Sequence, residues 1–154
     1  MKRSKAFVQA LFLLVMIFTG CAQNQIDIRK PEFAVSVPEY RSGSEDSRCT
    51  LGGVYFDFYN RASSPVAFIE TRMNVYDRKT GKNAFTSQGT IKSGSNIKIK
   101  AGEKKELCVC LDDYITVQSE EGYLIDQFYV SRIDYEDGRV WKDEWGLYAC
   151  GGGK

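Results

Sequence analysis

Four cysteines in the body of the chain have the clearest potential for chemistry: Cys49, Cys108, Cys110 and Cys150. Thiols can pair as disulfides, bind a metal ion or take part in redox exchange. Cys108 and Cys110 are two residues apart, so in a strand both side chains point to the same face, and a bond between them would strain it. We therefore expect each of them to pair with a different flanking segment, one containing Cys49 and the other Cys150.

The spacing of these cysteines argues against two alternatives. A zinc site with four cysteine ligands favours two pairs with two to four residues between the members, and this chain has one C-x-C and two single cysteines. The C-x-C pair also lacks the helix N-terminus that lowers a thiol pKa in C-x-x-C redox proteins. We expect no bound metal and no cofactor.

Carboxylates gather at a second place, where Asp134, Glu136 and Asp137 surround a turn. They could bind Ca²⁺, but Trp145 stands at the twelfth position from Asp134, where an EF-hand has Glu. A carboxylate pair could also hydrolyse a glycoside if Trp141 and Trp145 stacked on the sugar. We favour a solvated hairpin tip and a buried Trp141, because burying so large a ring stabilises a small domain.

The chain contains no histidine, which excludes several kinds of enzyme. Ser-His-Asp and Cys-His catalysis and any His-ligated metal site are impossible without it. Its absence also removes the usual general base near neutral pH. The sequence therefore favours a protein that is not an enzyme.

The N-terminus reads as an export signal. A basic start at residues 1–5 precedes an apolar run at 6–18, then Thr19 and Gly20. The run is shorter than the roughly 20 residues that span a bilayer, and a short basic and apolar segment before small residues is typical of a secretory signal.

The tetrapeptide Phe18-Thr19-Gly20-Cys21 resembles the lipobox of bacterial membrane lipoproteins, with Phe18 in place of the usual Leu. This resemblance implies cleavage after Gly20 and a diacylated Cys21 that tethers the protein to a membrane outside the cytoplasm. Ala22 rather than Asp follows, which favours the outer membrane where an envelope has two membranes. An ordinary secretory signal with a chance cysteine is the alternative.

The expected export and the composition limit what the rest of the chain can be. An even cysteine count in an exported chain favours disulfides, and each such loop would constrain the unfolded chain by roughly 3–4 kcal/mol. Without Lys2, Arg3 and Lys5, the mature chain has 18 basic and 20 acidic residues, a net charge of −2. This near-neutral balance gives no electrostatic footprint for nucleic acid. We expect a signal at 1–20, a tether at 21–32 and one domain at 33–154.

Short runs of alternating apolar residues, separated by turn residues, predict a β-rich domain. The expected strands are residues 33–37, 54–59, 66–76, 83–91, 96–100, 105–111, 123–135 and 140–142. Polar turns are expected at 41–47, 77–82, 93–95 and 136–139, and residues 112–122 fit either a short helix or a loop. We predict an all-β fold, an antiparallel β-sandwich, with a small β-barrel as the alternative. The pattern over residues 50–148 resembles immunoglobulin-like domains of bacterial lipoproteins.

Two surface features have a functional and an ordinary interpretation. Exposed tyrosines suit protein interfaces, although half-buried strand packing is the favoured interpretation for this set: Tyr55, Tyr59, Tyr123, Tyr129, Tyr135 and Tyr148. A lysine cluster could bind phosphate, but lysines more often protect a sheet edge from pairing. The cluster comprises Lys98, Lys100, Lys104 and Lys105.

The sequence thus predicts a lipid-anchored envelope lipoprotein whose domain binds an envelope protein without catalysing a reaction. A carrier of a small ligand or metal is the first alternative. An envelope hydrolase, depending on Asp134 or Asp137, is the second.

Overall fold

Strand β3 (Gly52–Asn60) is the central strand of one sheet, sheet A, in the computed structural model. Val54, Phe56 and Phe58 alternate along it and are all buried against the second sheet. The structure describes residues 30–45, 48–84, 89–115 and 118–150. The expected signal segment, the lipobox-like tetrapeptide and most of the expected tether lie outside these residues.

Three strands pair with β3 in antiparallel register. They are β6 (Lys104–Cys110) along one edge, and β1 (Phe33–Val35) and then β2 (Glu39–Ser42) along the other. The second sheet, sheet B, has the order β5-β4-β7-β8. Its strands are β4 (Val66–Asp77), β5 (Ile91–Ile99), β7 (Tyr123–Tyr135) and β8 (Val140–Lys142).

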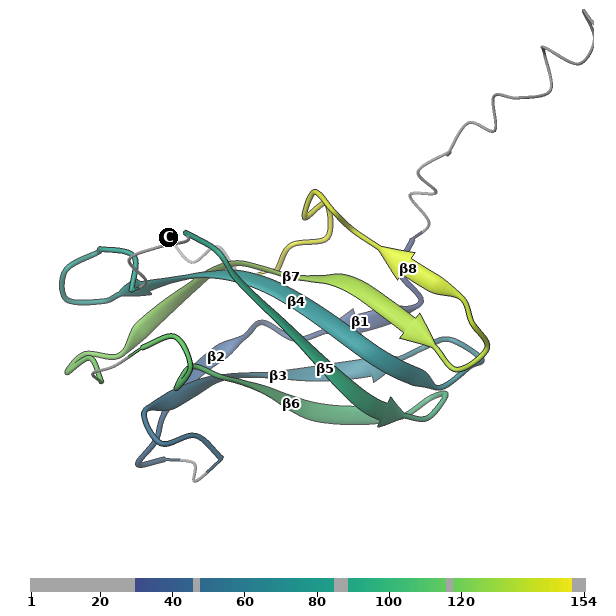
Figure 1. The fold of residues 1–154 in the computed structure, drawn as a ribbon, viewed down its shortest axis with the longest axis horizontal. Helices are drawn as coiled ribbons and strands as arrows, with labels where there is room; N and C mark the ends of the chain where they lie inside the picture. The colour runs from purple at the N-terminus through teal and green to yellow at the C-terminus, as the bar shows by residue number, and fades with distance from the viewer. Residues whose placement is uncertain (1–29, 46–47, 85–88, 116–117, 151–154) are drawn as a thin grey trace, which may run out of the picture.

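The two sheets stack face to face (Figure 1). The described strands form two antiparallel sheets and no closed barrel, so the β-sandwich prediction is confirmed and the barrel alternative is wrong. The described residues include no helix long and apolar enough to cross a membrane.

Aromatic rings join the two sheets in the core. The ring of Phe56 on β3 lies 4.7 Å from that of Phe128 on β7. Phe33 on β1 stacks on Phe58 and meets the edge of Trp141 on β8, with the Phe33 and Trp141 ring centroids 4.8 Å apart. Trp141 is therefore the buried core residue that the sequence predicted.

Two β-bulges in β7 keep its apolar side chains facing the core. Gln127 and Phe128 together lie opposite Met73, and Ser131 is an extra residue between two regular pairs. Each insertion shifts the alternation of side chains by one residue, because the side-chain period of a strand is two. Phe128 consequently points inward although Ile125, three residues earlier, also does.

One expected turn is wrong, and one expected strand is absent from the part of it that the structure describes. Ser93-Gly94-Ser95 lies in the middle of β5 and pairs with β4. A Cβ at Gly94 would lie 2.8 Å from the Phe68 ring, so glycine is present there for close packing. The strand expected at 83–91 is not present at its described ends, because Asn83 forms an isolated bridge and β5 begins at Ile91; residues 85–88 lie outside the described residues.

The structure also decides the expectations for two polar segments. The polar loop expected at 41–47 begins as β2, which extends to Ser42. The described parts of 112–122 are turns and loop, so the loop interpretation is the correct one there.

The first bulge gives a stability prediction at Gln127. Gln127 is not a glycine, yet its φ is positive, at 48°. A β-branched residue tolerates such a φ poorly. We expect Gln127→Val to lower the free energy of unfolding by about 1–2 kcal/mol. Gln127→Gly, the matched control, should not lower it. Urea unfolding of both variants checks this, and an equal loss in both would contradict it.

Candidate functional site

The most exposed large apolar side chains cluster on β8 and on the loop after it. Trp145 is 75% exposed and Leu147 is 59% exposed, far above the buried Trp141 in the same segment. We call this set the Trp145 patch: Val140, Trp145, Leu147 and Tyr148. Exposed apolar side chains gathered on one segment, as these are, suit an interaction site.

A buried carboxylate fixes the loop that carries the patch. Asp143 is only 4% exposed, and its side chain accepts hydrogen bonds from the backbone N–H groups of Trp145, Leu147 and Tyr148 at 3.0–3.2 Å. The backbone N–H of Asp143 is in turn bonded to the carbonyl of Ser131 on β7. The patch is thus held on the rigid sheet. The sequence analysis missed Asp143, whose signal is an Asp that precedes a glycine-containing turn.

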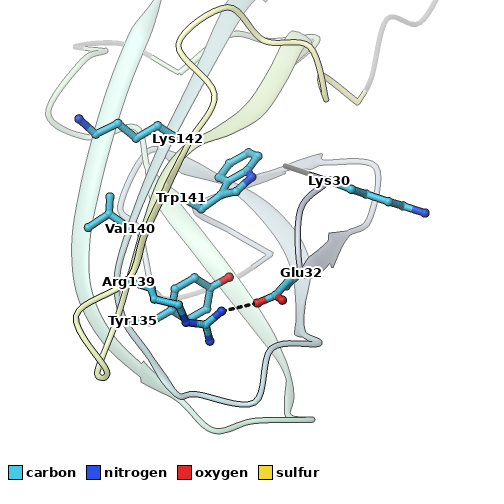
Figure 2. A pocket seen from close by; sticks show the side chains of 7 residues that line it. All are labelled: Lys30, Glu32, Tyr135, Arg139, Val140, Trp141 and Lys142. Atoms are coloured by element: carbon cyan, nitrogen blue, oxygen red, sulfur yellow. Dashed lines mark hydrogen bonds and ion pairs between the residues drawn. The ribbon is translucent and has the colours of Figure 1, made fainter. Parts of the chain in front are cut away.

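A hollow of about 240 Å³ lies beside the patch (Figure 2). Its lining residues are Lys30, Glu32, Tyr135, Arg139, Val140, Trp141 and Lys142. Figure 2 shows the Arg139 guanidinium beside the Tyr135 ring and directed toward Glu32, to which it donates at 2.8 Å. The hollow is smaller than the roughly 300–1,000 Å³ usual for ligand pockets.

The hollow also marks where the described chain begins. Lys30, the first described residue, lies in its wall beside Val140 and the rest of β8.

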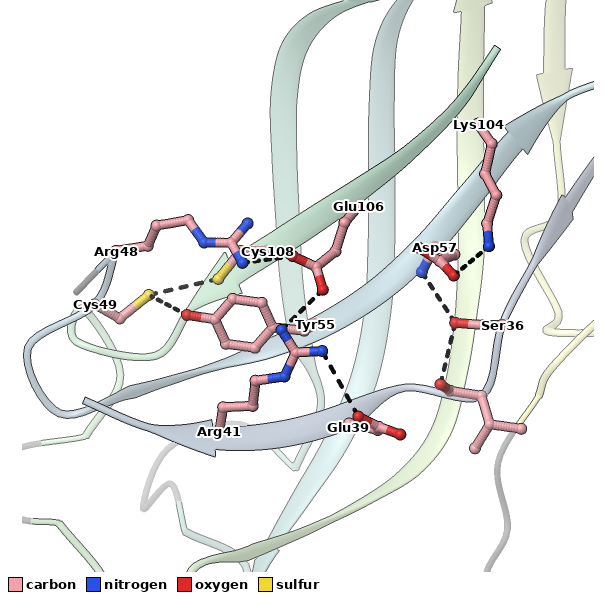
Figure 3. Close-up of polar contacts among 11 residues, drawn as sticks. Ser36, Glu39, Arg41, Arg48, Cys49, Tyr55, Asp57, Lys104, Glu106 and Cys108 are labelled. Carbon is pink, nitrogen blue, oxygen red and sulfur yellow. Dashed lines mark hydrogen bonds and ion pairs between the residues drawn. The ribbon is translucent and has the colours of Figure 1, made fainter. Parts of the chain in front are cut away.

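Cys49 and Cys108 lie at a separate place, on the outer face of sheet A (Figure 3). Cys49 and Cys110 form a disulfide. Cys108 and Cys150 are in no disulfide, so the expected second disulfide is not formed. The reason is their position: Cys108 lies on β6 opposite Tyr55, whereas Cys150 pairs with Phe128 at sheet B.

Tyr55 is buried on this outer face, although its position in β3 points away from the core. The guanidinium groups of Arg41 and Arg48 cover its ring at 4.6 and 4.5 Å. Both arginines also bind Glu106, and their hydrogen bonds lower the pKa of that carboxyl. This small outer cluster was not anticipated, although Tyr55, Cys108 and Cys110 share a face in the predicted strands.

Asp112 holds the loop next to Cys49. Its carboxylate accepts the backbone N–H groups of Leu51 at 2.8 Å and Thr50 at 2.6 Å. These bonds lower the pKa of Asp112, since they favour its charged form.

The other candidate carboxylates do not converge on a site. Asp134 is bound by Arg132 and Asp137 by Arg139, at 2.6 and 2.8 Å. Glu136 pairs instead with Lys98. Across residues 30–45, 48–84, 89–115 and 118–150, no three His, Cys, Asp or Glu side chains are grouped to hold a metal ion.

The tyrosines and lysines are distributed over the sandwich. Among the tyrosines, Tyr55, Tyr123 and Tyr135 are buried, Tyr129 is half-buried, and Tyr59 and Tyr148 are exposed. Lys98 lies on β5, and Lys104 and Lys105 lie on β6. Both are outer strands of their sheets, where lysines discourage pairing with other chains.

Comparison with known proteins informs the fold alone. No protein-family model matches the chain, and no curated protein matches it. A solved X-ray structure of a hypothetical protein from Peptoclostridium difficile 630 is similar, with a TM-score of 0.54 and 10% sequence identity. The match covers 75% of this chain and 88% of that one. At this identity the similarity supports the shared architecture and no shared activity.

Removing the Asp143 carboxylate should loosen the Trp145 patch. We expect Asp143→Ala to lower the free energy of unfolding by about 1–3 kcal/mol, because several backbone N–H groups lose their acceptor. The exposed neighbouring residue gives the control, and Glu144→Ala should change the stability by less than about 0.5 kcal/mol. Urea unfolding measures both, and equal effects would contradict the role of Asp143.

Asp112 should make the stability depend on pH. Because its pKa is lowered in the folded state, its stabilisation is complete above the ordinary aspartate pKa of about 4 and is lost as the pH falls through the lowered value. We expect Asp112→Asn to lower the melting temperature at pH 7, and the difference from wild type to shrink below about pH 4.

The exposed neighbour Asp113 supplies the control for this experiment. Asp113→Asn should leave the melting temperature unchanged at pH 7. A difference between wild type and Asp112→Asn that stayed constant down to the lowest pH would contradict the prediction.

Proposed function

We propose that this protein is a lipid-anchored envelope lipoprotein whose β-sandwich is a non-enzymatic binding module for another envelope protein. The observation that carries this proposal is the Trp145 patch, an exposed apolar surface that Asp143 holds in place beside the end of the tether. The absence of histidine from the chain supports a role other than acid–base catalysis.

The composition of the patch favours a protein partner. Trp, Tyr and Arg supply most of the binding energy at protein interfaces, usually at the centre of a patch with a polar rim. Here Trp145 and Tyr148 are flanked by Lys142, Glu144 and Arg139. Because the loop is already ordered by Asp143, binding would cost little further conformational entropy.

The anchor would restrict where this surface acts. Two acyl chains on Cys21 would hold the protein stably on a membrane. Nine residue steps separate Cys21 from Lys30, which allows a reach of at most about 30 Å. The Trp145 patch would therefore stay close to the bilayer surface, where the local concentration of a membrane-bound partner is high.

Site-specific photocrosslinking tests the binding surface in the native envelope. A photoreactive phenylalanine analogue replaces Trp145 in the full-length chain, and in a second protein it replaces Val37, an exposed apolar residue outside the patch. We expect one defined protein adduct from position 145 and none from position 37.

A second substitution establishes that the adduct depends on the patch. Leu147→Asp, in a variant whose melting temperature matches wild type, should reduce the adduct at least tenfold. Crosslinks from position 145 to phospholipid alone, or the same products from both positions, would contradict a protein-binding patch.

A further inference from the structure

Three sulfur atoms meet on the outer face of sheet A. Cys49 is bonded to Cys110. Figure 3 shows the Cys49 sulfur beside that of Cys108, and the two Sγ atoms lie 3.5 Å apart. Cys108 and Cys110 extend from the same face of β6, so their thiols lie on either side of Cys49. A reacting atom within about 3–3.5 Å is at near-attack distance.

Gly53 leaves the space that this arrangement needs. It pairs with Cys110 in the β3–β6 register, and Cys49 folds back over it. A Cβ at Gly53 would lie 2.7 Å from the Cys108 sulfur and 2.9 Å from the Cys49 sulfur. Gly53 on β3 thus leaves room for both sulfurs to approach each other.

Arginine and carboxylate side chains surround Tyr55, next to the sulfurs. Arg41 and Arg48 lie over the ring of Tyr55, and the Tyr55 hydroxyl lies 4.0 Å from the Cys49 sulfur. Glu106 is shared by the two guanidinium groups and Glu39 lies 3.7 Å from Arg41, so two carboxylates balance the two positive charges. The thiolate is the form of cysteine that attacks disulfides.

Chain entropy does not favour one pairing over the other. The Cys49–Cys110 bond spans 61 residues, and a Cys49–Cys108 bond would span 59. The entropy of closing a loop depends only on the logarithm of its length, so these two loops are equivalent.

We propose that Cys49, Cys108 and Cys110 form a thiol–disulfide exchange site that reacts with small disulfides. The Cys108 thiol loses its proton to solvent, and the thiolate attacks the Cys49 sulfur. The Cys49–Cys108 bond forms, the Cys49–Cys110 bond breaks, and Cys110 leaves as a thiolate. The step is redox-neutral, and one thiol of the three always remains.

The remaining thiolate then attacks an external disulfide. It forms a mixed disulfide with one half of that molecule and releases the other half as a thiolate. Cys108 is half-buried on the outer face of sheet A, so a small disulfide would approach it from that face. This inference concerns a different face from the Trp145 patch and does not depend on the lipid anchor.

Oxidised glutathione is the probe for this site. The full-length lipoprotein in detergent carries Cys150→Ser, which removes the remaining thiol of the domain, whose pKa burial raises. After incubation and acid quenching, fragment ions on either side of Val109 assign the glutathione to Cys108 or to Cys110. We expect both positions to be modified, in amounts within about tenfold of each other. Glutathione on Cys108 alone would overturn the proposal.

Two single variants test the exchange without any probe. We expect Cys110→Ser to form the Cys49–Cys108 disulfide on air oxidation, and Cys108→Ser to keep Cys49–Cys110 and serve as the folded control. Both should take up no glutathione at the cluster, because no thiol remains there. A Cys110→Ser protein that melts like the control but keeps both thiols would overturn the proposal.

Discussion

The contact between Phe56 on β3 and Phe128 on β7 is the interaction on which the rest of the structure depends. In the described chain, two sheets bury their apolar faces only against each other, so each long strand must keep its large side chains in phase with the core. The bulges at Gln127 and Ser131 achieve this in β7. They bring Tyr135 inward at the end of β7, next to the β7–β8 hairpin, while the loop that carries Trp145 follows β8 and lies beside Ser131.

Two places outside this core are rigid for different physical reasons. After β8, the buried Asp143 carboxylate accepts hydrogen bonds from three backbone N–H groups. These bonds fix the loop whose apolar side chains are exposed, since burial of those side chains does not hold it in place. On the outer face of sheet A, a disulfide and Asp112 hold the Cys49 loop, and paired arginines cover Tyr55. The two places lie on different sheets, which lets a binding surface and a thiol cluster exist without competing for the same residues.

The strands were predictable wherever alternation was regular, as in β3, β6 and β8, because a period of two needs no knowledge of the fold. β5 was misread because Gly94 indicates a turn in isolation, and its packing role depends on Phe68 from another strand. The spacing of the cysteines allowed the Cys49–Cys110 disulfide as one of several pairings and did not select it. No feature of the neighbouring sequence distinguishes Cys108 from Cys110 as the partner of Cys49. The position of Cys150 beside Phe128 depends on the bulge in β7, which the sequence pattern did not predict. Asp143 was missed because its role comes from burial, which spacing does not reveal.

An intact mass of the native, non-reduced protein extracted from its own membrane tests the central claim most directly. We predict the mass of residues 21–154 plus acyl chains, less the two hydrogens lost in one disulfide. An unlipidated chain would contradict the lipoprotein assignment and the membrane-proximal position of the Trp145 patch. A lipidated chain lacking four hydrogens would instead contradict the account of the cysteines, because Cys108 and Cys150 would then be oxidised.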